Sequence, residues 1–177
     1  MTGEKEYTDR AKRIKLLILD VDGVMTDGKI VLDGNGTEIK SFNVRDGHGI
    51  KMAQRAGMAI AIITGRESKV VDLRAKELGI TEVYQKSHDK LATYTELLKK
   101  LGLKEDETAF VGDDIVDLPV MKRVGVSIAV ADAEPYVKDM ASMVTVRNGG
   151  EGAVREVIDW LLRAKGEWEG VTAKYFS

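Results

Sequence analysis

The sequence contains no cysteine and only two prolines among its 177 residues. Without cysteine the chain can form no disulfide bond, no thiolate metal site and no cysteine nucleophile, and a reducing compartment suits it. No apolar run approaches the length of a membrane span, and the polar first residues lack the apolar core of a signal peptide. We therefore expect a cytoplasmic protein that does not enter a membrane.

A strong excess of one charge is also absent, because 27 lysine and arginine residues face 29 aspartate and glutamate residues. The formal net charge of −2 provides no general attraction to nucleic acid or to an anionic membrane surface. Local groups must therefore hold any anionic ligand. We expect a small-molecule partner rather than a nucleic acid or a membrane.

Size and composition predict a single domain over residues 1–177. With 44% hydrophobic and 32% charged residues, the chain can form one substantial core and is too short for two full domains. It has no low-complexity segment, and its prolines mark no linker. Within this domain we expect a projecting hairpin at about 28–42 and a C-terminal tail at about 165–177.

The run Leu16–Leu19 is followed by two carboxylates, Asp20 and Asp22, and then by Gly23. Such a run is typical of a strand that is buried on both faces. Because side chains alternate along an extended strand, both carboxylates should point the same way unless the chain curls there, and they repel each other unless a cation lies between them. The sequence therefore predicts a metal site at the end of this strand.

Apolar runs and helical patterns alternate through the rest of the chain. This rhythm predicts an α/β fold, an open, doubly wound parallel sheet of Rossmann-like type with helices on both faces. Ligands bind beyond the carboxyl ends of the strands in such folds. The expected strands are 58–63, 83–84, 108–111, 126–130 and 143–146, and the expected helices are 46–57, 67–78, 89–101, 116–124, 135–140 and 153–164.

Two segments lie outside this alternation. The β-prone runs 29–32 and 38–42 flank the turn sequence Asp-Gly-Asn-Gly and predict a hairpin. Because an isolated two-stranded hairpin is marginal in water, we expect it to pack against its own domain or against a neighbouring subunit. Residues 4–14 predict a solvated helix or arm, and the three aromatic residues of the tail predict that it docks on the protein.

Polar groups follow several other predicted strands, and the fold would gather them at the edge where Asp20 and Asp22 lie. They comprise a hydroxyl, an ammonium group and carboxylates that can complete a site for a hard cation. Together with a carboxylate nucleophile, these groups suit phosphoryl transfer. The members of this set are Thr64, Lys90, Asp113, Asp114 and Asp117.

The predicted catalytic residues are Asp20, Asp22, Thr64 and Lys90. A phosphate ester resists attack by an anion, so Mg²⁺ and a lysine must neutralise its oxygens. Asp20 would attack phosphorus, while Asp22 would protonate the leaving oxygen and later accept a proton from the water that hydrolyses the aspartyl-phosphate. Thr64 would donate a hydrogen bond to a phosphoryl oxygen, and Lys90 would add positive charge there.

These motifs resemble those of the haloacid dehalogenase superfamily, whose members carry Asp-x-Asp-Gly, a strand-end Thr or Ser, a Lys and a Gly-Asp-Asp-x-x-x-Asp-like motif. Here they are 20–23, Thr64, Lys90 and 112–117. The segment that follows the first motif is too short for a separate cap domain. The chain thus resembles the capless group, in which a hairpin builds a homotetramer and neighbouring subunits close the active site.

Within the capless group, the chain resembles phosphatases of 3-deoxy-D-manno-octulosonate 8-phosphate from about residue 15 to residue 164. This resemblance implies Mg²⁺-dependent hydrolysis to the free sugar acid and phosphate through an aspartyl-phosphate, in lipopolysaccharide precursor synthesis. It implies metal binding by Asp20, Asp22 and Asp113. The implied substrate contacts are Asp22, Asn43, Val44, Arg45, Asp46, Gly47, Lys51, Arg66, Arg74 and Lys90.

Arg66 favours the eight-carbon substrate, because relatives that act on nine-carbon keto-sugar acid phosphates tend to have Glu at this position. Guanidinium groups suit a sugar acid with a carboxylate and a phosphate, since they bind planar anions at two points. The chain departs from the family at Lys86, near which relatives usually have Gly.

Structural interpretations remain open for several of these residues. Thr64 suits the N-cap of a helix that begins near Glu67, a role compatible with catalysis. Asp117 can be interpreted as a support of the metal ligands or as a helix cap. Arg74 can be interpreted as a substrate contact or as part of a surface salt bridge.

Three alternatives to the main prediction remain. The first is a phosphatase of a nine-carbon acid, the second a phospho-acceptor signalling domain, and the third a non-catalytic binding subunit that keeps the fold. A signalling domain would have its acceptor Asp on a middle strand, where this chain has Thr64.

Overall fold

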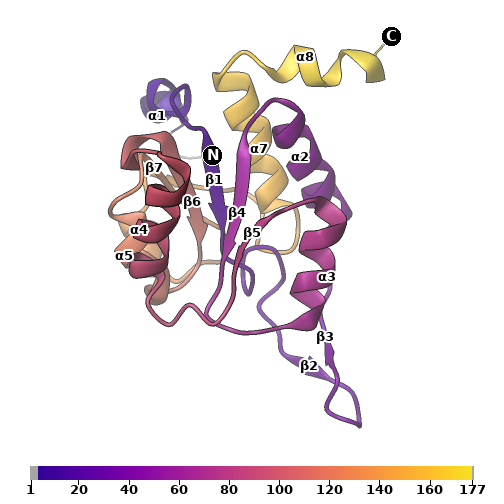
Figure 1. The fold of residues 1–177 in the computed structure, drawn as a ribbon. Helices are drawn as coiled ribbons and strands as arrows, with labels where there is room; N and C mark the ends of the chain where they lie inside the picture. Colours follow the sequence, from indigo (N-terminus) through magenta and orange to yellow (C-terminus); the bar gives the residue numbers. More distant parts are fainter. Residues whose placement is uncertain (1–3, 177) are drawn as a thin grey trace.

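The computed structural model describes residues 4–176 and contains a six-stranded parallel sheet (Figure 1). Its strands are β1 (Leu16–Leu19), β4 (Ala59–Ile63), β5 (Glu82–Tyr84), β6 (Thr108–Gly112), β7 (Val126–Ala129) and β8 (Met143–Val144). Their order in the sheet is β5-β4-β1-β6-β7-β8. The predicted doubly wound α/β sheet is therefore confirmed, and the strand order reverses at β1.

Helices cover both faces of the sheet. Figure 1 shows α2 (Val44–Arg55), α3 (Lys69–Leu78) and α7 (Ala153–Ala164) on one side, and α4 (Lys90–Leu101) and α5 (Leu118–Met121) on the other. The remaining α-helices are α1 (Glu4–Ala11), α6 (Pro135–Met140) and α8 (Trp168–Thr172). Among residues 4–176, no helix is both long and apolar enough to cross a membrane.

The first strand lies at the centre of the core. β1 pairs with β4 on one side and with β6 on the other, and all four of its side chains are fully buried. Burying each leucine or isoleucine contributes about 1.5–3 kcal/mol relative to leaving it exposed. The carboxyl end of β1 is therefore held rigidly at the middle of the sheet edge.

Two expectations about helix starts are wrong. The helix expected at 116–124 is instead a 3₁₀ turn, Ile115–Asp117, followed by the short helix α5, because Asp114 and Asp117 form a capping box and Pro119 starts a new helix. The N-cap of α3 is Ser68 rather than Thr64. The Thr64 N–H still donates to the Tyr84 carbonyl at 2.9 Å, so the chain is extended there.

The predicted hairpin is present as β2 (Val31–Leu32) and β3 (Glu38–Ile39), which project from the carboxyl end of the sheet (Figure 1). In its turn, the Asp33 carboxylate accepts the N–H groups of Asn35 and Thr37. The hairpin leaves its apolar side chains largely exposed, with Ile30 at 59% and Leu32 at 58%. Its own domain does not cover these side chains.

The tail docks on the opposite end of the molecule from the hairpin, as Figure 1 shows for α8. The Arg163 guanidinium lies 3.9 Å from the centre of the Trp168 ring. The Tyr175 hydroxyl lies 3.0 Å from His48 Nε2 and accepts a hydrogen bond from Arg55. The predicted docking is thus confirmed, although Phe176 remains exposed.

Asp46 joins α2 to the start of α7. Its side chain is buried, and its Oδ1 accepts the Arg155 N–H at 2.7 Å, while the N-cap of α7 is Gly152, which has no side chain to cap with. A carboxylate in this position also complements the helix dipole. Asp46 therefore connects two helices that pack together.

The pKa of Asp46 leads to a prediction about stability. Burial raises this pKa to about 6, against the opposing effects of the Arg155 N–H and the Arg147 charge. The folded state thus binds more protons than the unfolded chain between about pH 4 and pH 6, so this carboxyl group lowers stability as the pH rises through that window. In Asp46→Asn we expect the free energy of unfolding to fall less over this pH window, by roughly 2 kcal/mol.

Denaturant unfolding of both proteins from pH 4 to pH 7 measures this difference. Asp139→Asn is the control, because Asp139 is exposed on α6. Parallel pH curves for the wild type and Asp46→Asn would show that Asp46 does not titrate in this range.

Candidate active site

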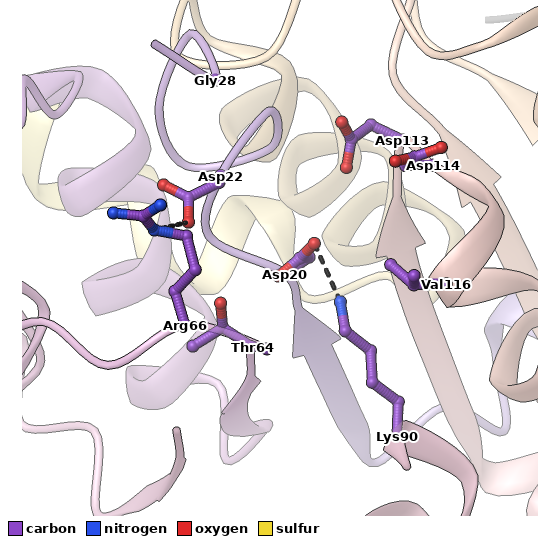
Figure 2. A pocket seen from close by; sticks show the side chains of 10 residues that line it. Asp20, Asp22, Gly28, Thr64, Arg66, Lys90, Asp113, Asp114 and Val116 are labelled. Carbon is purple, nitrogen blue, oxygen red and sulfur yellow. Dashed lines mark ion pairs between the residues drawn. The ribbon is translucent and has the colours of Figure 1, made fainter. Parts of the chain in front are cut away.

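A pocket of about 290 Å³ opens at the carboxyl edge of the sheet (Figure 2). It lies where β1, β4 and β6 end and where α4 begins. This is the edge at which the sequence predicted the polar groups to gather. The lining residues are Asp20, Asp22, Gly28, Thr64, Gly65, Arg66, Lys90, Asp113, Asp114 and Val116.

Asp20 directly follows β1 and is held by three contacts. Its N–H donates to the Val111 carbonyl, its Oδ1 accepts the Val21 N–H at 2.7 Å, and its Oδ2 lies 2.9 Å from Lys90 Nζ. Lys90 also contacts Asp117 Oδ1 at 2.6 Å. The side chains of Asp20, Lys90 and Asp117 are all more than nine-tenths buried, so water screens these pairs only weakly.

Burial and mutual repulsion shift the pKa values of Asp20 and Asp113 upward. Burial, the Asp20 charge and the Asp117 charge raise the pKa of Asp113 to about 8. Burial and Asp117 also raise the pKa of Asp20, although Lys90 opposes this. Burial lowers the pKa of Lys90, but the charges of Asp20 and Asp117 outweigh it and raise that pKa overall. The site therefore holds more negative charge than one lysine balances.

Oxygen atoms of Asp20, Asp113 and Asp117 lie within 4.8 Å of one another. Asp113 Oδ1 is buried and has no hydrogen-bond partner among the described residues. A hard dication prefers carboxylate oxygens and would satisfy this atom. The donor set thus fits a magnesium ion.

Gly23 lets the loop after β1 approach Asp113. A Cβ at Gly23 would lie 2.0 Å from Asp113 Oδ2, and the φ of +89° is one that other residues rarely adopt. Asp117 supports the opposite side by accepting the Asp113 N–H at 3.0 Å. Asp117 is therefore both a member of the acidic cluster and a cap of this loop.

Asp22 does not converge with Asp20, because the chain curls after β1. The Val21 carbonyl accepts the N–H groups of Val24, Met25 and Thr26, so the extended alternation ends there. Figure 2 shows the Asp22 carboxylate turned toward Arg66, whose Nε lies 3.6 Å from Asp22 Oδ2. Of the three predicted metal ligands, the structure therefore brings together the side chains of Asp20 and Asp113 only.

Sequence reasoning missed two residues at this site, Lys40 and Glu38. Lys40 Nζ pairs with Asp22 Oδ1, and Glu38 Oε1 lies 3.3 Å from Lys40 Nζ and 3.0 Å from Arg66 Nη2. A hydrogen bond from Ser68, together with Arg66 and Lys40, keeps the pKa of Glu38 below its ordinary value. Their i, i+2 spacing at the start of a predicted strand was a usable signal, since it places both side chains on one face.

Most of the predicted substrate contacts lie outside this pocket. Arg66 and Lys90 line it with Asp22, whereas the others lie on α2, directly before it or, for Arg74, on α3. There Asn43 caps α2, and Arg74 donates to the Asn43 carbonyl at 3.4 Å and pairs with Glu77 at 2.8 Å. Arg74 thus forms the surface salt bridge that was one of its two interpretations. The other predicted contacts outside the pocket are Val44, Arg45, Asp46, Gly47 and Lys51.

A second hollow of about 350 Å³ includes Phe42, Val44 and Arg74. Gly47 lies against it, because a Cβ there would come within 2.3 Å of Arg74 Nη2. Val44 and Arg74 therefore line a second surface, separate from the first pocket, whereas Asp46 and Gly47 are buried.

The loop before Lys90 contains the departure noted in the sequence. Lys86 has a φ of +55°, a left-handed conformation that glycine adopts more readily. Nearby, the Ser87 N–H donates to the Thr64 carbonyl at 3.0 Å, which holds this loop beside the pocket. The loop thus keeps its turn without glycine.

Comparisons with known proteins agree with this geometry. Residues 68–158 match the family model of haloacid dehalogenase-like hydrolases. The chain is 52% identical over 158 residues to the 3-deoxy-D-manno-octulosonate 8-phosphate phosphatase KdsC of Escherichia coli K12, covering 89% of this chain and 84% of that protein.

Two crystal structures of such phosphatases superpose closely. The protein from Yersinia pestis has a TM-score of 0.92 at 50% identity, covering 93% of this chain and 89% of that one. The protein from Moraxella catarrhalis, in complex with magnesium ion, phosphate ion and KDO, has a TM-score of 0.94 at 40% identity, covering 97% and 98%. The chain belongs to the haloacid dehalogenase-like hydrolases.

Proposed function

We propose that this protein is a phosphatase that hydrolyses 3-deoxy-D-manno-octulosonate 8-phosphate to the free sugar acid and phosphate, in the synthesis of lipopolysaccharide precursors. The observation that carries the proposal is the buried Asp20 carboxylate, paired with Lys90 beside the unpartnered oxygen of Asp113. The similarity to phosphatases of this substrate over most of the chain supports the choice of reaction.

Magnesium is the cofactor in this proposal, with Asp20 and Asp113 as side-chain ligands. Asp117 completes the acidic cluster. Asp22 is the third proposed ligand, as the resemblance to the family implies. When bound, the ion would neutralise phosphoryl oxygens and so lower the barrier to attack by an anion. Burial and the neighbouring carboxylates of Asp20 and Asp117 raise the pKa of Asp113, and a dication would relieve the repulsion between these carboxylates.

The side chains divide the chemistry between them. Asp20 is the nucleophile, since its Oδ2 is oriented by Lys90 and its Oδ1 by the Val21 N–H. Asp22, which lines the pocket on the Arg66 side, protonates the leaving oxygen and then accepts a proton from water. Thr64 donates a hydrogen bond from its hydroxyl to a phosphoryl oxygen, and Lys90 supplies positive charge there.

A homotetramer would unite the two surfaces that carry the predicted substrate contacts. The hairpin exposes Ile30, Val31, Leu32 and Ile39, an apolar surface that a neighbouring subunit can cover. The contacts around α2, including Asn43 and Arg74, would then reach a neighbouring subunit's pocket. In this proposal each chain is a single catalytic domain in the cytoplasm.

Leu32→Asp should dissociate the assembly, because burying an unpaired carboxylate in the hairpin contact is unfavourable. We expect a monomer mass by size-exclusion chromatography with light scattering, and turnover reduced by at least about 10-fold if neighbours complete the site. Met140→Asp is the control, since Met140 is similarly exposed but lies on α6. An unchanged mass for Leu32→Asp would exclude the hairpin as the assembly contact.

Phosphate release from a panel of sugar-acid phosphates tests the proposed function. With Mg²⁺ present, we expect the eight-carbon acid to be preferred over nine-carbon keto-sugar acids, and Arg66→Glu to weaken that preference by about 10-fold or more. A folded, metal-loaded protein that releases no phosphate from the panel would reject the phosphatase. Stable retention of phosphate from a small donor would instead favour the signalling domain.

A further inference from the structure

The Asp22 carboxylate lies between two cations, one for each oxygen. Lys40 Nζ pairs with Oδ1, and Arg66 Nε lies 3.6 Å from Oδ2. Glu38 Oε1 contacts both cations and ties them together. The two sides differ, because Lys40 makes a hydrogen bond to Oδ1 whereas Arg66 stands beyond hydrogen-bond distance from Oδ2.

Lys40 is unusually buried for its position. It directly follows β3, yet its side chain is only 2% exposed, while Leu32 and Ile39 of the same hairpin are more than half exposed. Burying an ammonium group and fixing its flexible side chain both cost free energy. The contact is therefore unfavourable unless the ion pairs with Asp22 and Glu38 offset that cost. Lys40 also does not line the pocket. It therefore contacts Asp22 on the side away from the pocket and does not touch the space where substrate would bind.

We propose that Lys40 is a positioning residue for the acid–base step. This inference rests on the proposed function, in which Asp22 exchanges protons with the leaving oxygen and with water. By engaging Oδ1, Lys40 prevents the carboxyl group from rotating and leaves Oδ2 on the side of the pocket that Arg66 lines. Oδ2 is then the atom that donates and later accepts the proton. The hairpin thus contributes to chemistry within its own chain as well as to assembly.

The test compares two substrates that differ in their need for a general acid. An alkyl phosphate such as 3-deoxy-D-manno-octulosonate 8-phosphate releases a basic oxygen that must be protonated, whereas p-nitrophenyl phosphate releases a stable phenolate. In Lys40→Met we expect kcat on the sugar phosphate to fall by roughly 10²-fold with little change in KM. The pre-steady-state burst of p-nitrophenolate should stay within about 3-fold of the wild type, because formation of the aspartyl-phosphate from it needs no acid.

Two further variants separate positioning from a structural role. Lys40→Arg keeps a cation beside Oδ1 and should recover most of the lost kcat. Lys15→Met is the matched control, because Lys15 forms an exposed pair with Glu107 next to the other end of β1. Lys40→Gln provides the same comparison if the Met variant does not fold.

A loss that is equal for both substrates, or no loss at all, would overturn the positioning role. A wild-type protein inactive on both substrates would instead reject the proposed phosphatase itself, and with it this role for Lys40. The wild-type measurement therefore separates the two failures.

Discussion

Asp20→Asn is expected to abolish turnover while leaving the fold intact. The amide has nearly the same shape as the carboxylate but lacks its nucleophilic oxygen, so no aspartyl-phosphate can form, and the rate should fall by at least about 10³-fold. Folding should tolerate the change, because burial and Asp117 already raise the pKa of Asp20 and so disfavour its charge. Lys90 keeps its contact with Asp117 in this variant.

Phosphate release measures the effect on turnover, and thermal unfolding measures the effect on the fold. Asp27→Asn is the matched control, since Asp27 lies in the loop that follows β1 but is partly exposed and pairs with Lys29. Turnover by Asp20→Asn at the wild-type rate would mean that another group attacks phosphorus.

Lys90→Met is expected to impair both stability and activity. It leaves Asp20 and Asp117 buried without their shared cation, and loss of one partner of a buried ion pair typically costs 3–5 kcal/mol. We expect the free energy of unfolding to fall by about 3 kcal/mol and turnover to fall by roughly 10²-fold or more. Magnesium should restore part of the stability, because an ion that binds only the folded protein stabilises it.

Denaturant unfolding with and without Mg²⁺ tests this prediction. Lys100→Met is the control in the same helix, since Lys100 is exposed and its pair with Glu82 is screened by water, so its loss should change stability far less. If Lys90→Met were as stable as the wild type in the absence of metal, the carboxylates would not depend on Lys90 for charge compensation.

The sequence was sufficient to predict the parallel sheet and the edge of the sheet at which the site lies. Apolar runs bounded by glycine and polar residues identified the strands, and the alternation of strands and helices predicted a parallel sheet with its ligands at the carboxyl edge. Helix starts were harder, because capping depends on local backbone geometry. Thr64 and Ser68 are both capping residue types, and strand pairing at Thr64 decided between them.

The roles of the hairpin and of Asp46 could not be predicted so directly. Lys40 and Asp22 are separated by 18 positions, and their contact exists only because the hairpin folds back onto the loop after β1. Asp46 contacts Arg155, which lies 109 positions away, on the helix packed against its own. Such pairs arise from packing between elements, and no short sequence pattern contains both partners.

The sequence by itself determined that a buried strand ends in Asp20 and Asp22, and that Thr64, Lys90 and Asp113 would come to the same edge. It did so because side-chain polarity and strand–helix alternation are local properties. Only the tertiary structure decided that the two carboxylates separate, with Asp20 facing Lys90 and Asp22 facing Lys40 and Arg66. The physical reason is the curl at the Val21 carbonyl, which turns the chain between the two residues.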